Sequence, residues 1–256
     1  MTWKFGGTDL GMVANDGRYG ISELSSPNDL PETRGKNPVV PLREGTIHSP
    51  KIFDERTISL GMWIVGDNRQ DFQSRLDTLK QLLGRRQRQT LQRIMEDGST
   101  REAQAEVART LGFRKQGPAY GRFTVDFLLA EPHMRSDTLT DTGSVGISSS
   151  PHDFTLNNPG TAEDRSAIIT FDGPLENPKL TNQDNGIWVG LIGILGAGSS
   201  YEINTAEFSI SPTDYDILQH SGDNYFMVIN PGDNAMRLET DTTGGSVRIQ
   251  FYAPYL

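Results

Sequence analysis

The stretch ERTISLGMWIVGDNRQDFQSRLDTLKQLLG, residues 55–84, decides the fold of this chain. Over residues 57–65 apolar and polar side chains alternate, the period-two pattern of a strand with one buried face. From Asp71 onward apolar residues recur at helical spacing, which predicts one amphipathic helix whose apolar stripe packs against the sheet. Asp67, Asn68 or Asp71 can cap its start, and Gly84 is expected to end it in a left-handed conformation. The predicted core of this first domain is Ile58, Leu60, Met62, Ile64, Phe72, Leu76, Leu79, Leu82 and Leu83.

Two segments flanking this stretch have open interpretations. Residues 24–54 contain five prolines and little periodicity, which predicts a long arm that is either ordered by a partner or simply flexible. The run Arg85–Arg88 is a candidate phosphate patch, but no aromatic residues interleave with it. A solvated helix end, where arginine complements the helix dipole, is therefore the favoured interpretation.

The rest of the chain is predicted to be β-rich. Residues 100–110 and 120–130 alternate like strands, and the second segment ends at Glu131-Pro132. Residues 135–151 have the Ser, Thr, Gly and Asp composition of a linker. After it, many short strands separated by Pro-Gly and Asp-Gly turns predict a β-sandwich of jelly-roll type. We expect a first domain over 1–135, a linker over 136–152 and a second domain over 153–256.

Charge is distributed unevenly along the 256 residues. Residues 1–150 carry 20 Lys and Arg against 19 Asp and Glu, whereas residues 151–256 carry 4 against 14. The acidic second half is a poor candidate for nucleic-acid binding, because phosphate neutralisation needs Lys and Arg. The absence of cysteine excludes disulfides and a thiol nucleophile. No segment approaches the ~20 apolar residues that cross a bilayer.

Motifs for catalysis are missing from the sequence. There is no GxSxG elbow, P-loop or HExxH, and the glycines of residues 190–198 lack the third glycine of a dinucleotide motif. The four histidines lie far apart, and the aspartates of residues 214–241 do not match an EF-hand loop. We therefore predict no catalytic residues, no cofactor and no metal. The aromatic residues Trp188, Tyr201 and Tyr225 are candidates for contact with a sugar or a protein partner.

Two separated groups of motifs resemble one protein family, the distal tail proteins of long-tailed siphophages. In the first half the resemblance rests on Gly17-Arg18-Tyr19, on Arg56-Thr57-Ile58-Ser59-Leu60 leading into the leucine-rich helix, and on Phe123-Thr-Val-Asp-Phe127 before Glu131-Pro132. In the second half it rests on Asn157-Asn158-Pro159-Gly160, on residues 168–174, on Asn177-Pro178-Lys179-Leu180 and on Asn230-Pro231-Gly232-Asp233-Asn234.

The resemblance implies a mainly β protein: an N-terminal split β-barrel with one packed helix, like tail-tube subunits, then a galectin-like or carbohydrate-module-like β-sandwich. It implies a structural, non-enzymatic virion protein of the phage tail tip, assembled in the host cytoplasm. A homo-hexameric ring would join the tail tube protein to the tail-tip hub, baseplate or fibre proteins. Phage DNA would pass through it without specific binding.

Two other functions remain open from the residues alone. The second half by itself is compatible with a carbohydrate-binding module or host-surface adhesin that contacts cell-wall glycans. A glycosidase would need two carboxylates about 5–9.5 Å apart, a distance that sequence does not measure. We expect the structural role, with the adhesin as the alternative.

Overall fold

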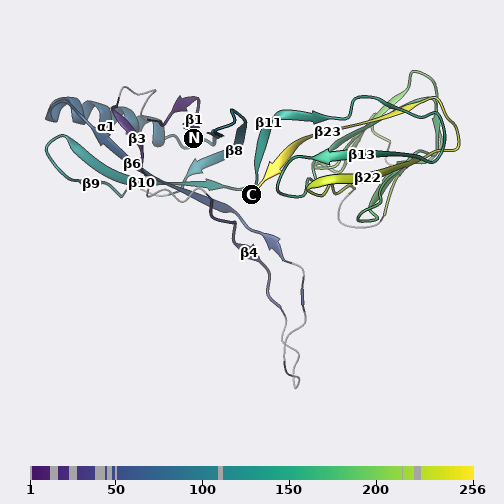
Figure 1. Ribbon diagram of the computed structural model, residues 1–256, viewed down its shortest axis with the longest axis horizontal. Coiled ribbons are helices and arrows are strands. Elements are labelled where there is room, and N and C mark those ends of the chain that lie inside the picture. Colours follow the sequence, from purple (N-terminus) through teal and green to yellow (C-terminus); the bar gives the residue numbers. More distant parts are fainter. Residues whose placement is uncertain are drawn as a thin grey trace. The chain divides into compact units, whose positions relative to one another are not determined.

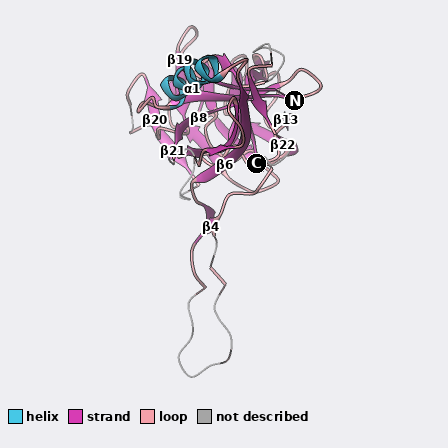
Figure 2. Ribbon diagram, turned by 90° about the vertical axis from the view of Figure 1, so that its left-hand side faces the viewer, coloured by secondary structure: helices cyan, strands magenta, loops and turns pink. Residues whose placement is uncertain are grey.

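The structure, a computed structural model, describes residues 2–11, 17–22, 28–37, 44, 48–49, 51–108, 112–214, 216–221 and 226–256. The chain divides into two compact units, Met1–Arg135 together with Leu256, and Ser136–Tyr255. Each unit has its own hydrophobic core, and strands dominate both (Figure 1). One helix lies within the described residues, drawn in cyan in Figure 2. The mainly β fold class predicted from the sequence is confirmed.

Unit 1 is an open antiparallel sheet with one helix. Its sheet order is β2-β1-β7-β8-β10-β6-β3, and β9 also pairs with β10. Because this order begins at β2 and stops at β3, the sheet is split rather than closed within the described residues. The elements are β1 (Thr2–Phe5), β2 (Thr8–Asp9), β3 (Tyr19–Ile21), β4 (Thr33–Arg34), β5 (Ile52–Phe53), β6 (Arg56–Val65), α1 (Arg69–Leu83), β7 (Gln89–Ile94), β8 (Thr100–Val107), β9 (Arg114–Lys115) and β10 (Tyr120–Leu129).

Strands β6 and β10 pair along their whole length and form the centre of unit 1. Their register places Met62 opposite Phe123 and Ile58 opposite Phe127. These side chains share one face, since residues two apart in a strand point the same way. The helix adds its apolar stripe to the same cluster. All nine residues named above as the core of this domain are buried there.

The helix begins at Arg69, and Asn68 is its N-cap. The Asn68 Oδ1 accepts hydrogen bonds from the backbone N–H groups of Gln70 and Asp71, both at 3.0 Å. The expected left-handed stop at Gly84 is wrong, because its φ is −83°. The Gly84 N–H donates to the Lys80 carbonyl at 2.7 Å, and a Cβ on Gly84 would lie 2.7 Å from that same oxygen. Close approach, rather than positive φ, therefore favours glycine here.

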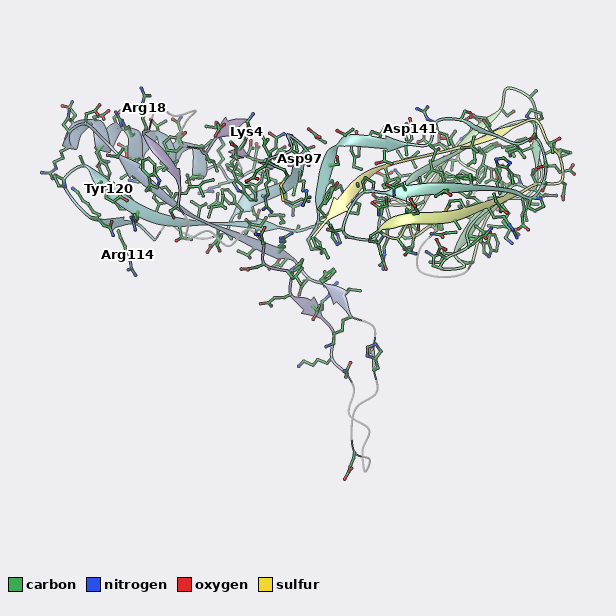
Figure 3. All side chains as sticks on the ribbon, viewed as in Figure 1. Lys4, Arg18, Asp97, Arg114, Tyr120 and Asp141 are labelled. Atoms are coloured by element: carbon green, nitrogen blue, oxygen red, sulfur yellow. The ribbon has the colours of Figure 1, made fainter. Side chains whose placement is uncertain are left out.

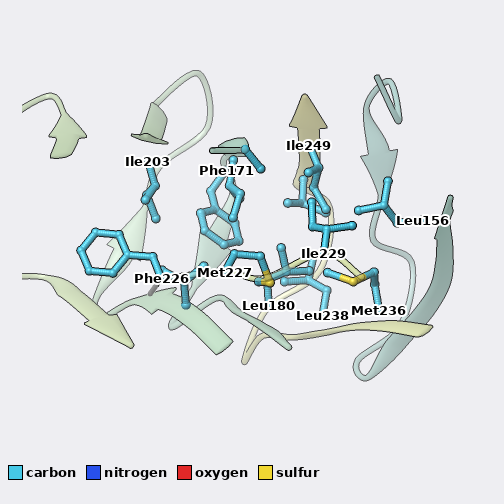
Figure 4. Packing of buried hydrophobic residues seen from close by; sticks show 14 of the residues in the cluster. Leu156, Phe171, Leu180, Ile203, Phe226, Met227, Ile229, Met236, Leu238 and Ile249 are labelled. Carbon is cyan, nitrogen blue, oxygen red and sulfur yellow. The ribbon is translucent and has the colours of Figure 1, made fainter. Parts of the chain in front are cut away.

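Unit 2 is a β-sandwich of two antiparallel sheets. One sheet has the order β11-β23-β14-β19-β20, with β12 also on β23, and the other has the order β13-β22-β16-β17-β21. In Figure 4, Phe171, Ile203 and Ile249 face Leu180, Met236 and Leu238 across the core. The strands are β11 (Met134–Asp141), β12 (Val145–Gly146), β13 (His152–Asn158), β14 (Ile168–Asp172), β15 (Leu175–Glu176), β16 (Lys179–Asn182), β17 (Trp188–Leu191), β18 (Ile194–Leu195), β19 (Ser200–Asn204), β20 (Ser209–Ser211), β21 (Leu218–His220), β22 (Gly232–Glu239) and β23 (Ser246–Tyr255).

The structure differs from the sequence-based expectation over residues 136–152. This polar stretch, expected to be a linker, carries most of β11 and all of β12, both paired with β23. Asp141 at the end of β11 accepts hydrogen bonds from Arg248, and the Thr142 N–H donates to the Ile249 carbonyl at 3.1 Å. Main-chain pairing and one ion pair hold this strand. Its side chains therefore need no apolar alternation.

Candidate assembly and binding surfaces

The two ends of the unit 1 sheet meet beside the helix. The Tyr19 hydroxyl of β3 donates to the Asp9 carbonyl of β2 at 3.5 Å, a side-chain link in place of a backbone ladder. Burial raises the pKa of Tyr19, and the charge of Asp9 acts in the same direction. A cavity of about 240 Å³, lined by Thr8, Tyr19 and the helix residues Thr78 and Leu82, lies at this junction. The split of the sheet is thus covered in part by α1.

Strands β4 and β5 form a two-stranded ribbon of their own (Figure 1). The Asp54 N–H donates to the Glu32 carbonyl at 2.8 Å, which extends the ladder by one bond. Its start is anchored by Arg93, whose Nη2 donates to the Asn28 Oδ1 at 2.8 Å. Large apolar side chains remain exposed along it: Leu30 (69%), Ile52 (46%) and Phe53 (37%). Exposed apolar side chains gathered on one ribbon make it a candidate contact surface.

Charged pairs line the outer face of the five-stranded sheet of unit 2. Arg237 donates from Nε and Nη2 to the two carboxylate oxygens of Asp153, at 2.7 and 2.9 Å. The hydrogen bonds from Arg237 lower the pKa of Asp153, and the same bonds raise the pKa of Arg237. Thr181 lies opposite Arg237 on one side and Trp188 on the other. Lys179 pairs with Glu239 at 3.3 Å and stands over the Trp188 ring, 5.1 Å from its centroid.

The three candidate contact residues do not form one platform. Trp188 lies on β17 in the five-stranded sheet, on the polar face just described. Tyr201 lies on β19 in the other sheet, and its side chain packs against the core of unit 2. Tyr225 falls outside the described residues. Trp188 and Tyr201 thus belong to opposite sheets. Aromatic residue type alone does not show which sheet or which face a strand residue occupies.

Most acidic residues of the second half lie on its surface, whereas Asp164 is buried. Each of the four Lys and Arg residues of 151–256 pairs with a carboxylate: Arg165 with Glu163, Lys179 with Glu239, Arg237 with Asp153 and Arg248 with Asp141. The other carboxylates of this half have no further Lys or Arg in 151–256 to neutralise them. Unit 2 therefore presents a negative field to any partner.

The basic run Arg85–Arg88 lies between α1 and β7, and its side chains are exposed. Within the described part of the chain, no group of three or more His, Asp or Glu side chains could hold a metal ion. Among those same residues, no helix has the length and apolar character required to cross a bilayer.

Comparison with known proteins finds a similar fold among solved structures. No protein-family model matches the sequence, and no curated protein matches it. Among solved structures, the chain is similar to the crystal structure of the SPP1 Dit protein (gp 19.1), described as a paradigm of the hub adsorption apparatus of phages that infect Gram-positive bacteria. The TM-score is 0.70 at 14% identity, over 100% of this chain and 99% of that chain.

Two structures of the phage p2 baseplate in its activated conformation also match. With Sr the TM-score is 0.39 at 11% identity, over 100% of this chain and 99% of that chain. With Ca it is 0.38 at 11% identity, over 94% and 92%. The chain thus has the fold of SPP1 Dit, and the resemblance to distal tail proteins is confirmed at the level of the fold.

Proposed function

We propose that this chain is a structural virion protein of a long-tailed phage. It forms a homo-hexameric ring at the distal end of the tail tube and joins the tube to the tail-tip hub, baseplate or receptor-binding proteins. The observation that carries the proposal is the similarity to SPP1 Dit over the whole length of both chains. The role is one of assembly and needs no catalytic step, cofactor or metal.

The open sheet of unit 1 supports ring formation. An unpaired strand edge tends to pair with another chain, and a closed cyclic assembly leaves no edge free. Among the described residues, the sheet of unit 1 ends at β2 and β3, and its β4–β5 ribbon exposes Ile52 and Phe53. In the ring these surfaces contact the neighbouring subunit. Phage DNA passes through the centre without sequence-specific contacts.

Unit 2 offers a further surface for partners of this assembly. Its negative charge suits hub or fibre proteins with basic docking surfaces. The protein is assembled in the host cytoplasm and remains at the tail tip of the virion.

Electron microscopy tests the ring, on the purified protein and on the virion tail tip. We expect six-fold rings, and we expect Ile52→Asp with Phe53→Asp to abolish them. Leu139→Asp, at a residue 40% exposed in unit 2, serves as the control and should leave rings intact. Protein that stays monomeric in solution and forms no annular density at the tail tip would overturn the proposal.

A second candidate function is binding of host cell-wall glycans by unit 2. It is favoured by the position of Trp188 under Lys179, on a polar sheet face that also carries Arg237 and Asp153 on more distant strands. Sugars stack on aromatic rings and hydrogen-bond to such polar groups. A glycan array should then show binding that Trp188→Ala removes. Tyr252→Ala, which changes an aromatic residue 46% exposed on β23, should retain it. Equal binding by both variants would contradict a glycan site at Trp188.

A further inference from the structure

A groove on unit 1 carries positive charge that no function described above uses. Its volume is about 570 Å³, and it lies over β6, β10 and the segment that enters β9. Arg114, Gln116, Arg122 and Thr124 line it with polar groups, Phe113 adds an apolar surface, and Gly61 contributes no side chain. Figure 3 labels Arg114 and Tyr120 at this part of unit 1.

Two arginines on adjacent strands line the groove side by side. Arg114 of β9 and Arg122 of β10 are register partners, and both side chains are exposed. Cross-strand partners have Cβ atoms roughly 5 Å apart, and like charges at that position destabilise a sheet. Among the described residues, neither guanidinium forms an ion pair with a carboxylate. An anion between them would convert the repulsion into two attractive contacts.

Contacts with Tyr120 orient the Arg122 side chain for binding such an anion. Its Nε donates to the Tyr120 hydroxyl at 2.8 Å, and its guanidinium carbon lies 5.8 Å from the centroid of the Tyr120 ring. This arrangement fixes the plane of the guanidinium and leaves its two terminal nitrogens to donate. Planar guanidinium groups bind carboxylates in bidentate geometry, with less loss of side-chain freedom when they are held in advance.

The shape of the groove selects the class of anion. Nucleic-acid backbones are followed by stripes of several cations, often with stacked aromatic residues. This groove has two arginines, and its volume suits a few side chains rather than a strand of nucleotides. In the described part of the chain β9 pairs only with β10, so its other edge offers backbone groups to an extended peptide.

We propose that this groove binds an extended acidic peptide segment of a partner protein, with an Asp or Glu carboxylate bridging Arg114 and Arg122. Gln116 and Thr124 supply further hydrogen bonds, and Phe113 contacts an apolar side chain of the segment. The inference does not depend on ring formation, because every residue it uses lies in one copy of unit 1.

Fluorescence anisotropy of the full chain tests this with a labelled eight-residue peptide of alternating Glu and Ser. We expect saturable binding that weakens about 10-fold or more in Arg114→Gln and in Arg122→Gln, the loss typical of one charge-assisted hydrogen bond. Arg88→Gln, an exposed arginine outside the groove, is the control for the same loss of charge and should bind as the wild type does.

Two further probes complete the test. A peptide with Gln in place of Glu should bind at least 10-fold more weakly, and an eight-nucleotide oligothymidylate should bind more weakly than the Glu peptide. The proposal is overturned by absence of binding at millimolar peptide, by an equal loss in Arg88→Gln, by equal binding of the Gln peptide, or by preference for the oligothymidylate. Thermal melts of Arg114→Gln should be no lower than wild type, because the substitution relieves a like-charge pair.

Discussion

Gly66 lies directly against the backbone of Phe72 in the first turn of α1. A Cβ atom on Gly66 would stand 2.5 Å from the Phe72 nitrogen and 2.6 Å from its Cα. The turn between β6 and α1 therefore depends on a residue without a side chain, and this close approach sets how the helix meets the sheet.

Replacing this glycine tests the approach. Gly66→Ala should lower the free energy of unfolding by about 1–3 kcal/mol, the usual cost of overpacking, because backbone atoms must move to admit the methyl group. Urea denaturation measures the change. Gly117→Ala is the matched control, since a Cβ there meets nothing within 4 Å. Equal stability of the two variants would show that the turn relaxes freely.

The helix stripe is predicted to carry much of the stability of unit 1. Leu79 is 1% exposed and belongs to the cluster that joins α1 to the sheet. Leu79→Ala should cost roughly 2–5 kcal/mol, because it removes buried methyl groups and leaves a cavity. Leu139→Ala, at a residue 40% exposed, should stay within about 0.5 kcal/mol of wild type. Calorimetry of both variants distinguishes the outcomes. A small loss of stability in Leu79→Ala would refute the prediction that packing of the helix against the sheet stabilises unit 1.

A buried asparagine pair braces the sandwich of unit 2. The Asn182 Nδ2 donates to the Asn234 Oδ1 at 2.9 Å and to the Val228 carbonyl at 2.8 Å, and both asparagines are fully buried. Asn182→Ala leaves these acceptors without that donor, so we expect a loss of about 1–3 kcal/mol in chemical denaturation. Asn157→Ala, at an exposed residue of β13, is the control. A neutral Asn182→Ala would mean that water replaces the lost donor.

Acid should destabilise unit 2 in part through Asp153. Its folded-state pKa is lowered by the hydrogen bonds from Arg237, so the carboxylate stabilises the fold above its unfolded pKa of about 3.9. That contribution is lost as pH falls through the folded-state pKa. Asp153→Asn should therefore be less stable than wild type at neutral pH, and its stability should fall less steeply on acidification below about pH 4.

Thermal melts across this pH range measure the effect. Glu202→Gln, which removes an exposed carboxylate that forms no ion pair among the described residues, is the control for the loss of one negative charge. Parallel curves for wild type and Asp153→Asn would show that the pair with Arg237 contributes nothing to stability.

Local periodicity explains which secondary-structure elements can be predicted from the sequence. The alternation from Ile58 to Ile64 and the stripe from Phe72 to Leu83 each repeat a buried face at a fixed interval, so β6 and α1 follow from the sequence alone. The short strands β1 and β7 lack such a run, so the sequence alone does not predict them. They are strands because their main chains pair with each other, Trp3 opposite Arg93.

The candidate surfaces depended even more on pairing. Trp188 and Tyr201 look alike in the sequence, yet one lies on a polar outer face and the other packs on the core. Arg114 and Arg122 belong to no recognisable sequence motif. Only the β9–β10 register brings their charges together at a groove.

The sequence by itself determined the mainly β class, the helix that packs against the first sheet and the acidic second half. These properties follow from composition and from repeats within a few residues. Tertiary structure alone decided which strand edges stay open, which aromatic face is polar and which cations lie opposite each other. Those features arise from hydrogen bonds between strands distant in the chain. Alternation within one strand shows which face is buried, but it does not show which distant strand pairs with it.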